Sequence, residues 1–272
     1  MYARKRYGQH FLHDPSVIER IIASVAPRSD EALLEIGPGH GALTEMLLAA
    51  AGTLDVVEID RDLVRELQAR YAGQPRLRVH SADALDFDYA ALAREHGRPL
   101  RVVGNLPYNV STPLLFRLLA AATHVRDMHF MLQREVVDRI VAVPGNRQYG
   151  RLGVMLAPRV RATRLFEVGP GAFRPAPKVW SAVIRMRFRP PAVAMTMESR
   201  ALFERLIRSL FAQRRKTVAN ALRPLATSLH ADARLALARA GIDPSSRPET
   251  LHLADLAALA AALGSPAGSS VV

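Results

Sequence analysis

The chain of 272 residues contains no cysteine, which excludes disulfide bonds and thiolate chemistry. Its nine histidines show no paired spacing of the H-x-x-x-H kind, so we predict no metal site. The first residues, MYARKRYGQHFLHD, are basic and aromatic and lack the apolar segment of a secretory signal. No apolar run reaches the length of a membrane span. We therefore expect a soluble, cytoplasmic protein.

Acidic residues are in the minority. There are 37 Lys and Arg against 25 Asp and Glu, which gives a net charge of +12. Basic side chains neutralise phosphates, so this excess favours a polyanionic partner, although a solvated basic surface without a partner is the alternative. The hydrophobic fraction of 49% can form the core of one large domain with a small appendage.

Between about Ala32 and Pro190, short β-branched runs alternate with amphipathic helical patterns, which is typical of an α/β domain with a parallel sheet. Seven strands are predicted, at Ala32–Ile36, Thr53–Ile59, Leu77–His80, Arg101–Val103, Asp127–Leu132, Thr163–Val168 and Ala182–Phe188. Helices are predicted between them, at Ala42–Ala51, Asp62–Tyr71, Thr112–Ala121 and Arg134–Val143. The passage Gly169–Pro177 is longer than a hairpin turn, and long loops of this kind are often functional.

After Pro190–Pro191 the pattern becomes purely helical. Helices are predicted at Met197–Ala212, Lys216–Leu222, Ala231–Ala240 and Leu251–Leu263, separated by Pro224, Gly241 and Pro244. We therefore divide the chain into residues 1–190 and a small α-helical domain, residues 191–272. The final GSPAGSSVV has the composition of a disordered tail.

A glycine loop follows the first predicted strand in LLEIGPGHGALTEMLL, with Gly37, Gly39 and Gly41. Glycine permits a tight turn and lets a ligand approach the backbone. With Ala42 the loop also fits the dinucleotide pattern G-x-G-x-x-A, so a nicotinamide-dependent enzyme and a purely structural turn both stay open.

Acidic residues end the next two strands. Glu58, in VVEID, can accept hydrogen bonds from the hydroxyls of a ligand ribose, whereas we expect Asp60 to cap the following helix. Asp83, in HSADALDFD, can accept a hydrogen bond from the amine of a bound adenine, and Ala84 leaves space beside the ring. A second helix cap is the alternative for Asp83. Ligands bind at the carboxyl ends of such strands, so the three positions together predict a nucleoside-binding site.

The segment VVGNLPYNVSTPLL follows the fourth predicted strand. Its Asn105-Leu106-Pro107-Tyr108 resembles the N-[LIP]-P-[YF] signature of N6-adenine and related amino methyltransferases. The whole chain resembles the small-subunit ribosomal RNA adenine dimethyltransferases. Seven ordered blocks carry this resemblance: KRYGQHFLHD, EIGPGHGALT, VEIDRDL, SADALDFD, NLPYNVSTPLL, FRPAPKVWSAVIR and FAQRRKTVANAL.

The resemblance implies a Rossmann-like class I methyltransferase that uses S-adenosyl-L-methionine. An adenine amine is a poor nucleophile because its lone pair is delocalised into the ring. The Asn105 side-chain oxygen and the Leu106 carbonyl are expected to accept hydrogen bonds from that amine, with Asn105 also contacting the cofactor. Pro107 stiffens the loop, and Tyr108 stacks on the target base.

The resemblance assigns further roles. Gln9, His10 and Leu12 match a lid over the methionine and ribose parts of the cofactor, and His10 stands where asparagine is usual. Phe173 matches an aromatic that faces Tyr108 across the flipped base, and a loop aromatic covering the sheet edge is its alternative.

Seven basic residues are candidates for RNA contact. Lys178 is predicted to contact a phosphate, and a catalytic base is the less favoured alternative for it. Two basic clusters are the other candidates, although a charge run is often only a solvated face. The clusters are Arg4-Lys5-Arg6 and Arg214-Arg215-Lys216.

Three functions fit these features. The first is dimethylation of two adjacent adenosines near the 3′ end of 16S rRNA in the small ribosomal subunit, by a protein we expect to be monomeric. The second is methylation of large-subunit rRNA by a resistance-type enzyme. The third is a non-catalytic assembly or transcription factor on the same scaffold. A nicotinamide dehydrogenase is disfavoured because no catalytic His–Asp or Tyr–Lys pair is apparent.

Overall fold

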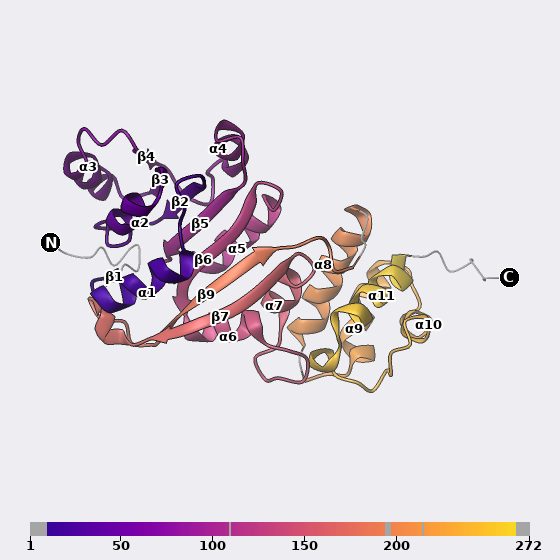
Figure 1. The fold of residues 1–272 in the computed structure, drawn as a ribbon. Helices are drawn as coiled ribbons and strands as arrows, with labels where there is room; N and C mark the ends of the chain where they lie inside the picture. Colours follow the sequence, from indigo (N-terminus) through magenta and orange to yellow (C-terminus); the bar gives the residue numbers. More distant parts are fainter. Residues whose placement is uncertain (1–9, 109, 194–196, 214, 265–272) are drawn as a thin grey trace. The chain divides into compact units, whose positions relative to one another are not determined.

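The computed structural model describes residues 10–108, 110–193, 197–213 and 215–264 (Figure 1). The chain divides into two compact units, Met1–Val137 with Arg161–Phe188, and Asp138–Val160 with Arg189–Val272. The last of the three boundaries, between Phe188 and Arg189, lies within two residues of the division we placed after position 190. Our assignment of Asp138–Val160 to the first domain differs from this division, because Tyr149 and Val154 in that segment join the buried cluster of the helical unit.

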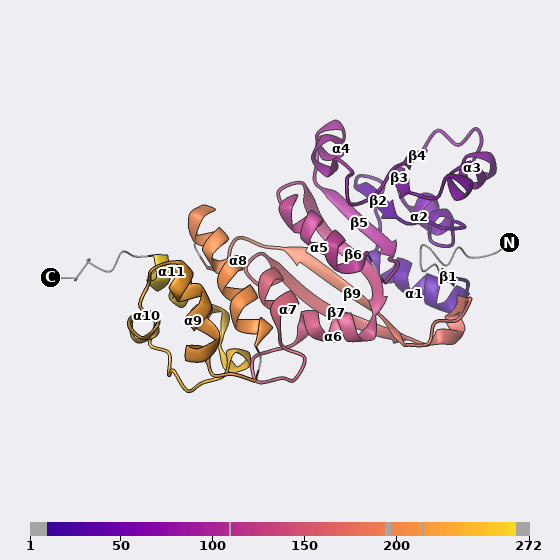
Figure 2. The same ribbon diagram turned by 180° about the vertical axis from the view of Figure 1, so that it is seen from behind.

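The first unit is built on a seven-stranded sheet with the order β4-β3-β2-β5-β6-β9-β7 (Figures 1 and 2). β4, β3, β2, β5 and β6 pair in parallel, and β9 pairs antiparallel with β6. The strands span Ala32–Ile36 (β2), Thr53–Glu58 (β3), Leu77–Ser81 (β4), Leu100–Asn105 (β5), Val125–Gln133 (β6), Val160–Val168 (β7) and Ser181–Phe188 (β9). The seven-stranded, mostly parallel sheet expected from the sequence is confirmed.

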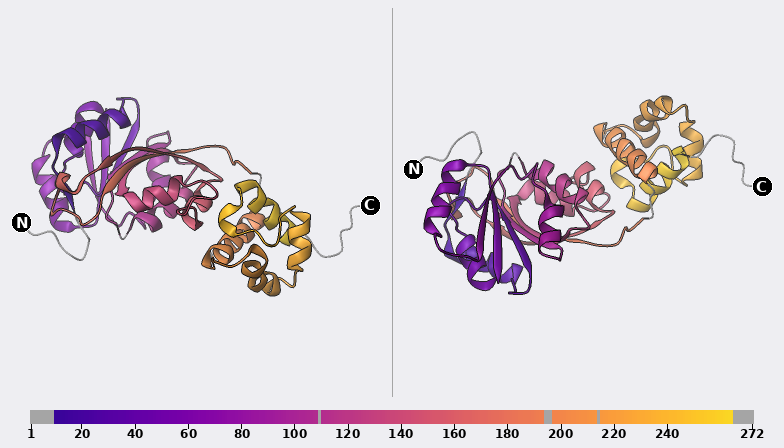
Figure 3. Two further views of the ribbon diagram at one scale, coloured as in Figure 1. Left: turned by 90° about the horizontal axis from the view of Figure 1, so that it is seen from below. Right: turned by 90° about the horizontal axis from the view of Figure 1, so that it is seen from above.

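Helices lie on both faces of this sheet (Figure 3). They span Pro15–Val25 (α1), Thr44–Ala50 (α2), Arg61–Arg70 (α3), Tyr89–Glu95 (α4), Ser111–Ala120 (α5) and Arg134–Val141 (α6). Because both faces are covered, every residue of β2 is buried. Four of the five residues in its sequence ALLEI are apolar, and the fifth, Glu35, is buried with them. The parallel strands β2, β3, β4 and β5 end at one edge of the sheet, which brings the four loops that follow them together.

Several short elements were not predicted from the sequence. β1 (Phe11–Leu12) pairs antiparallel with β8 (Phe173–Arg174), and a two-residue strand is too short to show a period. Helices α1, α4 and α7 (Arg151–Leu156) were also missed. A signal for α1 is present in the sequence, because Asp14 caps it by accepting from the Ser16 and Val17 amides and Pro15 occupies its first turn.

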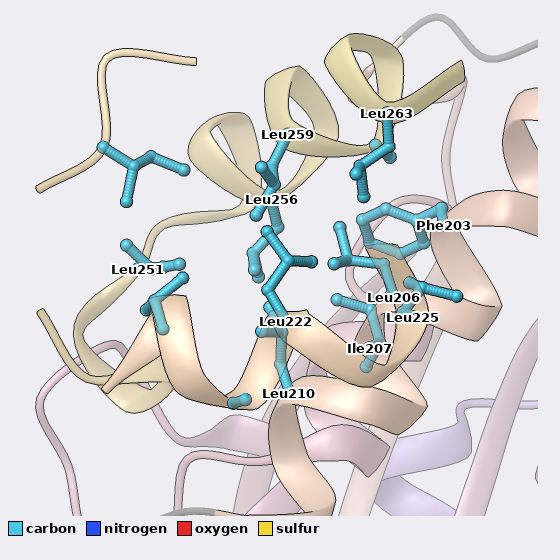
Figure 4. Packing of buried hydrophobic residues seen from close by; sticks show 14 of the residues in the cluster. Phe203, Leu206, Ile207, Leu210, Leu222, Leu225, Leu251, Leu256, Leu259 and Leu263 are labelled. Atoms are coloured by element: carbon cyan, nitrogen blue, oxygen red, sulfur yellow. The ribbon is translucent and has the colours of Figure 1, made fainter. Parts of the chain in front are cut away.

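The second unit contains the helices α7, α8 (Met197–Ala212), α9 (Val218–Ser228), α10 (Ala233–Arg239) and α11 (Leu253–Gly264), and the short 3-10 turn Pro248–Thr250 (η3). A second 3-10 turn, Pro170–Ala172 (η2), belongs to the first unit. Our prediction that Pro224 ends a helix is wrong, because Pro224 lies inside α9. Burial of the flanking Leu222 and Leu225 stabilises this helix against the missing backbone hydrogen bond. The core is a cluster of leucines and aromatics drawn from α8, α9 and α11 (Figure 4), among them Phe203, Leu206, Leu210, Leu256 and Leu259.

The first residue of the predicted tail, Gly264, is the last residue of α11. The rest of the predicted tail, from position 265 onward, lies outside the described residues. Among the helices of the described chain, none combines the length and apolarity that crossing a membrane requires.

Candidate active site

A cavity lies at the carboxyl edge of the parallel strands. Its walls come from β1 and from the loops after β2, β3, β4 and β5. Most of the predicted cofactor and catalytic residues line it: His10, Leu12, Gly37, Gly39, Glu58, Asp83, Ala84, Asn105, Leu106, Pro107 and Tyr108. The topology thus gathers five separate sequence motifs around one cavity.

The glycines of the loop after β2 have backbone conformations that favour glycine. Gly37, Gly39 and Gly41 have φ values of 67°, 58° and 82°. A Cβ on Gly39 would lie 3.0 Å from the Phe11 ring, so a side chain there would intrude where two cavity walls meet. Gly41 does not line the cavity, contrary to our expectation for a cofactor contact. A Cβ there would lie 3.3 Å from the Tyr71 hydroxyl, so close packing against α3 and the loop after it explains this glycine.

Glu58 ends β3 with its carboxylate held by backbone amides. Oε1 accepts from the Ile59 and Asp60 amides at 3.0 Å, and Oε2 accepts from the Gly39 amide at 3.3 Å. A carboxylate has about four acceptor sites, so one stays open for a ligand hydroxyl. Burial raises the pKa of Glu58, while the amide hydrogen bonds oppose the rise. Asp60 caps α3 by accepting from the Asp62 amide at 3.0 Å, as predicted.

Asp83 follows β4 at the cavity wall. Its Oδ1 accepts from the Leu85 amide at 2.8 Å, which fixes the carboxylate within its own loop. Oδ2 makes no hydrogen bond to any described residue. The adjacent Ala84 carbonyl accepts from the hydroxyl of buried Tyr89 at 2.6 Å, so α4 holds the loop in place.

Asn105 lies at the end of β5, and its side-chain Nδ2 donates to the His10 carbonyl at 3.0 Å. A carbonyl oxygen can only accept, so the amide nitrogen must face His10 and the Asn105 Oδ1 must face away from it. The next residue is fixed as well, because the Leu106 amide donates to the Met131 carbonyl at 3.2 Å. The loop therefore offers a side-chain acceptor beside a fixed backbone.

Tyr108 is half-buried at the cavity mouth. Its hydroxyl lies 3.0 Å from Ser181 Oγ, and burial raises its pKa. The ring facing it is that of His10, at a centroid distance of 5.6 Å and an interplanar angle of 31°. His10 Nδ1 lies 2.7 Å from the Pro175 carbonyl, so Nδ1 carries a hydrogen and donates. Nε2 of the neutral ring then accepts.

Phe173 is not where the resemblance predicted it. Its side chain is only 3% exposed, packs in the core cluster with Leu12 and Val17, and is absent from the cavity wall. Pairing of β8 with β1 explains the difference, because it places Phe173 opposite Leu12 at the sheet edge and directs the ring inward.

Glu35, Phe11 and His40 also line the cavity and were missed. Burial raises the pKa of Glu35 to about 7, the nearby Glu58 carboxylate adds to the rise, and a hydrogen bond from Thr44 Oγ1 at 2.6 Å opposes it. A carboxylate inside an otherwise apolar strand was the available signal. His40 Nδ1 lies 3.0 Å from Glu66 Oε1, and its ring packs 4.3 Å from that of Phe11. Nothing in the sequence around His40 indicated that its side chain would line the cavity.

None of the described residues that we predicted to contact RNA lines the cavity. Lys178, Arg215 and Lys216 are exposed and do not line it. Arg4, Lys5, Arg6 and Arg214, with the predicted lid residue Gln9, lie outside the described residues.

The mostly parallel seven-stranded sheet, with a glycine loop and acidic strand ends around one cavity, defines a Rossmann-like class I methyltransferase. Residues 1–263 match the ribosomal RNA adenine dimethylase family, and the chain belongs to that family. Methyltransferases of this family use S-adenosyl-L-methionine.

Curated relatives agree with this family. The chain is 53% identical over 257 residues to the ribosomal RNA small subunit methyltransferase A of Aromatoleum aromaticum, covering 94% of this chain and 92% of that one. It is 51% identical over 263 residues to the protein of the same name from Chromohalobacter salexigens, covering 95% and 90%.

Two solved structures share the fold. The crystal structure of the 23S rRNA methyltransferase ErmE aligns with a TM-score of 0.69 at 26% identity, covering 94% of this chain and all of that one. A dimethyladenosine transferase from Plasmodium falciparum aligns with a TM-score of 0.73 at 24% identity, covering 92% and 96%.

Proposed function

We propose that this protein transfers methyl groups from S-adenosyl-L-methionine to N6 of two adjacent adenosines near the 3′ end of 16S rRNA, in the small subunit or its precursor. The Asn105 amide carries this proposal, because its orientation leaves an acceptor for an adenine amine beside the cavity. The relatives named small subunit methyltransferase A support the choice of RNA. We further propose that it acts as a monomer in the cytoplasm.

The cavity fits the proposed cofactor on three grounds. The backbone at Gly37 and Gly39 leaves room that side chains would fill. Glu58 keeps one acceptor site for a ribose hydroxyl, and Asp83 keeps Oδ2 for an adenine amine. When bound, the cofactor supplies a methyl group that its sulfonium has already activated. The protein then has to position the two substrates and stabilise the developing charge.

The Asn105–Tyr108 loop would perform the positioning. The Asn105 Oδ1 and the Leu106 carbonyl can each accept one hydrogen of the target amine. Two such bonds oppose delocalisation of the nitrogen lone pair and direct it toward the methyl donor. Tyr108 supplies a ring on which the extruded base can stack, a contact worth about 1–3 kcal/mol per base. Its hydrogen bond to Ser181 fixes that ring.

The helical unit is suited to RNA by its charge. The sequence of this unit, residues 138–160 and 189–272, holds 15 Lys and Arg against 7 Asp and Glu, a net charge of +8 out of +12 for the whole chain. Phosphate neutralisation scales with such charge. We propose that Arg215 and Lys216 in this unit, and Lys178 in the first unit, contact the RNA backbone.

The second candidate, methylation of large-subunit rRNA, is favoured by the fold shared with the 23S rRNA methyltransferase ErmE. The identity to that protein is 26%, against 51–53% to the small-subunit enzymes, so we propose the small subunit. The test offers labelled S-adenosyl-L-methionine to unmethylated small subunits, large subunits and naked DNA, and maps the product by mass spectrometry. We expect N6,N6-dimethyladenosine only in 16S rRNA. Label confined to large-subunit RNA would establish the second candidate instead.

A further inference from the structure

Trp180 is the single tryptophan of the chain and immediately precedes β9. It is 49% exposed, and the neighbouring Val179 is 43% exposed. Among the large hydrophobic residues exposed in the described chain, these are the two that are adjacent in sequence. Packing does not require an aromatic ring of this size at the surface, so a binding role is the more economical explanation.

The Trp180 ring lies beside Gly169, a residue that has no side chain. Three of its carbons are 3.7–4.0 Å from the position that a Cβ on Gly169 would occupy. The Trp180 carbonyl accepts from the Arg134 amide at 2.9 Å, which fixes the backbone. The ring therefore has support on one side while half of its surface faces solvent. A supported, exposed ring is the geometry that base stacking uses.

Trp180 precedes a residue that contacts Tyr108, on whose ring we propose that the target base stacks. The next residue, Ser181, lies 3.0 Å from the Tyr108 hydroxyl through its Oγ. Successive side chains of an extended chain point to opposite sides. The Trp180 ring therefore lies on the other side of the chain from Tyr108, where it can contact a different nucleotide from the target base.

The charge around Trp180 favours an anionic partner, and the exposed ring favours a nucleic acid among anionic partners. Residues 168–197 contain no Asp or Glu. Arg174 and Lys178 in the same loop are exposed. An exposed aromatic ring between cations matches an unpaired base and its phosphates.

We propose that Trp180 stacks on an unpaired nucleobase flanking the target adenosine, while Lys178 and Arg174 contact the neighbouring phosphates. This inference rests on the proposed function for the identity of the RNA. It adds a second stacking position, outside the catalytic pocket, that selects single-stranded RNA at the mouth of the site.

Trp180 reports on its own binding because it is the single tryptophan. Wild-type protein is titrated with an oligoadenylate of about ten nucleotides while tryptophan emission is recorded. The control is an abasic strand of equal length, which carries the same phosphates and cannot stack. We expect the oligoadenylate to quench the emission and the abasic strand to bind, by anisotropy of a labelled end, without quenching. Equal quenching by both strands, or none by either, would overturn the proposal.

Kinetics of variants provide a second, independent measurement. Trp180→Leu should raise the KM for unmethylated small subunits by about 5- to 150-fold, the range for losing one stacked base. The kcat and the Kd for S-adenosyl-L-methionine should stay within twofold, and Trp180→Phe should restore most of the KM. Leu235→Ala, which truncates another exposed hydrophobic residue in the helical unit, is the matched control and should change nothing. A KM for Trp180→Leu within twofold of wild type would contradict stacking.

The two proposals fail in different ways. If the wild-type protein methylates no small-subunit RNA, the proposed function fails, while the oligoadenylate titration still measures stacking at Trp180. If methylation proceeds normally and neither quenching nor the KM responds, only the Trp180 proposal fails. Binding of a protein partner at this surface would give the second pattern.

Discussion

The Asn105 side-chain amide donates to the backbone carbonyl of His10 across 3.0 Å. This bond joins the catalytic loop after β5 to the short β1 segment on the other side of the cavity. It also determines which end of the amide is available, because only the nitrogen can face a carbonyl. The position of one backbone carbonyl thereby sets the chemistry that Asn105 can offer to a substrate.

Replacement of Asn105 tests this relationship directly. Asn105→Ala should abolish methyl transfer while leaving cofactor binding largely intact, because the acceptor for the target amine is lost. Asn105→Asp keeps an acceptor but places an anionic oxygen against the His10 carbonyl, so we expect it to be impaired as well. Single-turnover methylation and equilibrium binding of the cofactor separate the two effects. Turnover of Asn105→Ala at the wild-type rate would refute the role of this residue.

Tyr108 should act through its ring more than through its hydroxyl. Tyr108→Phe removes the hydrogen bond to Ser181, which is worth roughly 1 kcal/mol, and should reduce kcat/KM less than tenfold. Tyr108→Ala removes the stacking surface and should cost about 10- to 100-fold. Ser181→Ala is the matched control and should resemble Tyr108→Phe. Equal losses for the Phe and Ala variants would show that the hydroxyl is the functional group.

Gly39 and Gly73 form a matched pair for the glycine loop. Both have positive φ, 58° and 77°, so alanine should strain either backbone by about 1–2 kcal/mol. A Cβ on Gly39 would also meet the Phe11 ring at 3.0 Å, whereas a Cβ on Gly73 has nothing within 4 Å. We expect Gly39→Ala to raise the cofactor Kd at least tenfold and Gly73→Ala to leave it unchanged. Calorimetric titration of both variants measures this difference. Equal Kd values for the two variants would show that Gly39 does not contribute to cofactor binding.

The sequence was sufficient for the sheet and for most of the cavity, for a definite physical reason. Buried parallel strands consist of apolar runs, and such runs can be recognised in the sequences of β2 and β3. Ligand groups at their carboxyl ends must then converge whatever the loops do, so Glu58 and Asp83 could be placed without coordinates.

The features that could not be predicted from the sequence depend on contacts between segments far apart in the chain. The pairing of β1 with β8 buries Phe173 and leaves His10 opposite Tyr108, and no local pattern signals a two-residue strand. The same holds for residues 138–160, whose membership of the helical unit depends on tertiary packing of Tyr149 and Val154. Lateral contacts also explain Gly41, whose neighbours belong to α3 and the loop after it.

Glu35 predicts a pH dependence of stability. Its pKa is raised from 4.5 to about 7 in the folded protein. The folded state therefore keeps this proton in a range where the unfolded chain has lost it. The stabilisation is fully present below about pH 4.5 and is lost as the pH rises to about 7, an effect on the order of 3 kcal/mol for this fully buried group.

Glu35→Gln should remove this dependence, because a neutral amide can still accept from Thr44. In urea denaturation we expect the variant to exceed wild type in stability at pH 8 and to match it near pH 4.5. Glu19→Gln, at an exposed position of α1, is the control and should follow wild type throughout. A stability difference that does not vary with pH would rule out titration of Glu35 as its source.

Arg215 and Lys216 predict a salt dependence. Each phosphate contact contributes about 0.7–0.9 to the slope of log affinity against log salt concentration. The double variant Arg215→Ala/Lys216→Ala should therefore flatten the salt dependence of KM for small subunits by about one to two units of slope, with kcat unchanged because neither residue lines the cavity. Arg65→Ala, an exposed arginine of α3 paired with Asp62, should leave the slope as it is. If the double variant has the wild-type slope, the exposed cations of this turn are solvated surface, and the basic excess of the helical unit must act through other arginines.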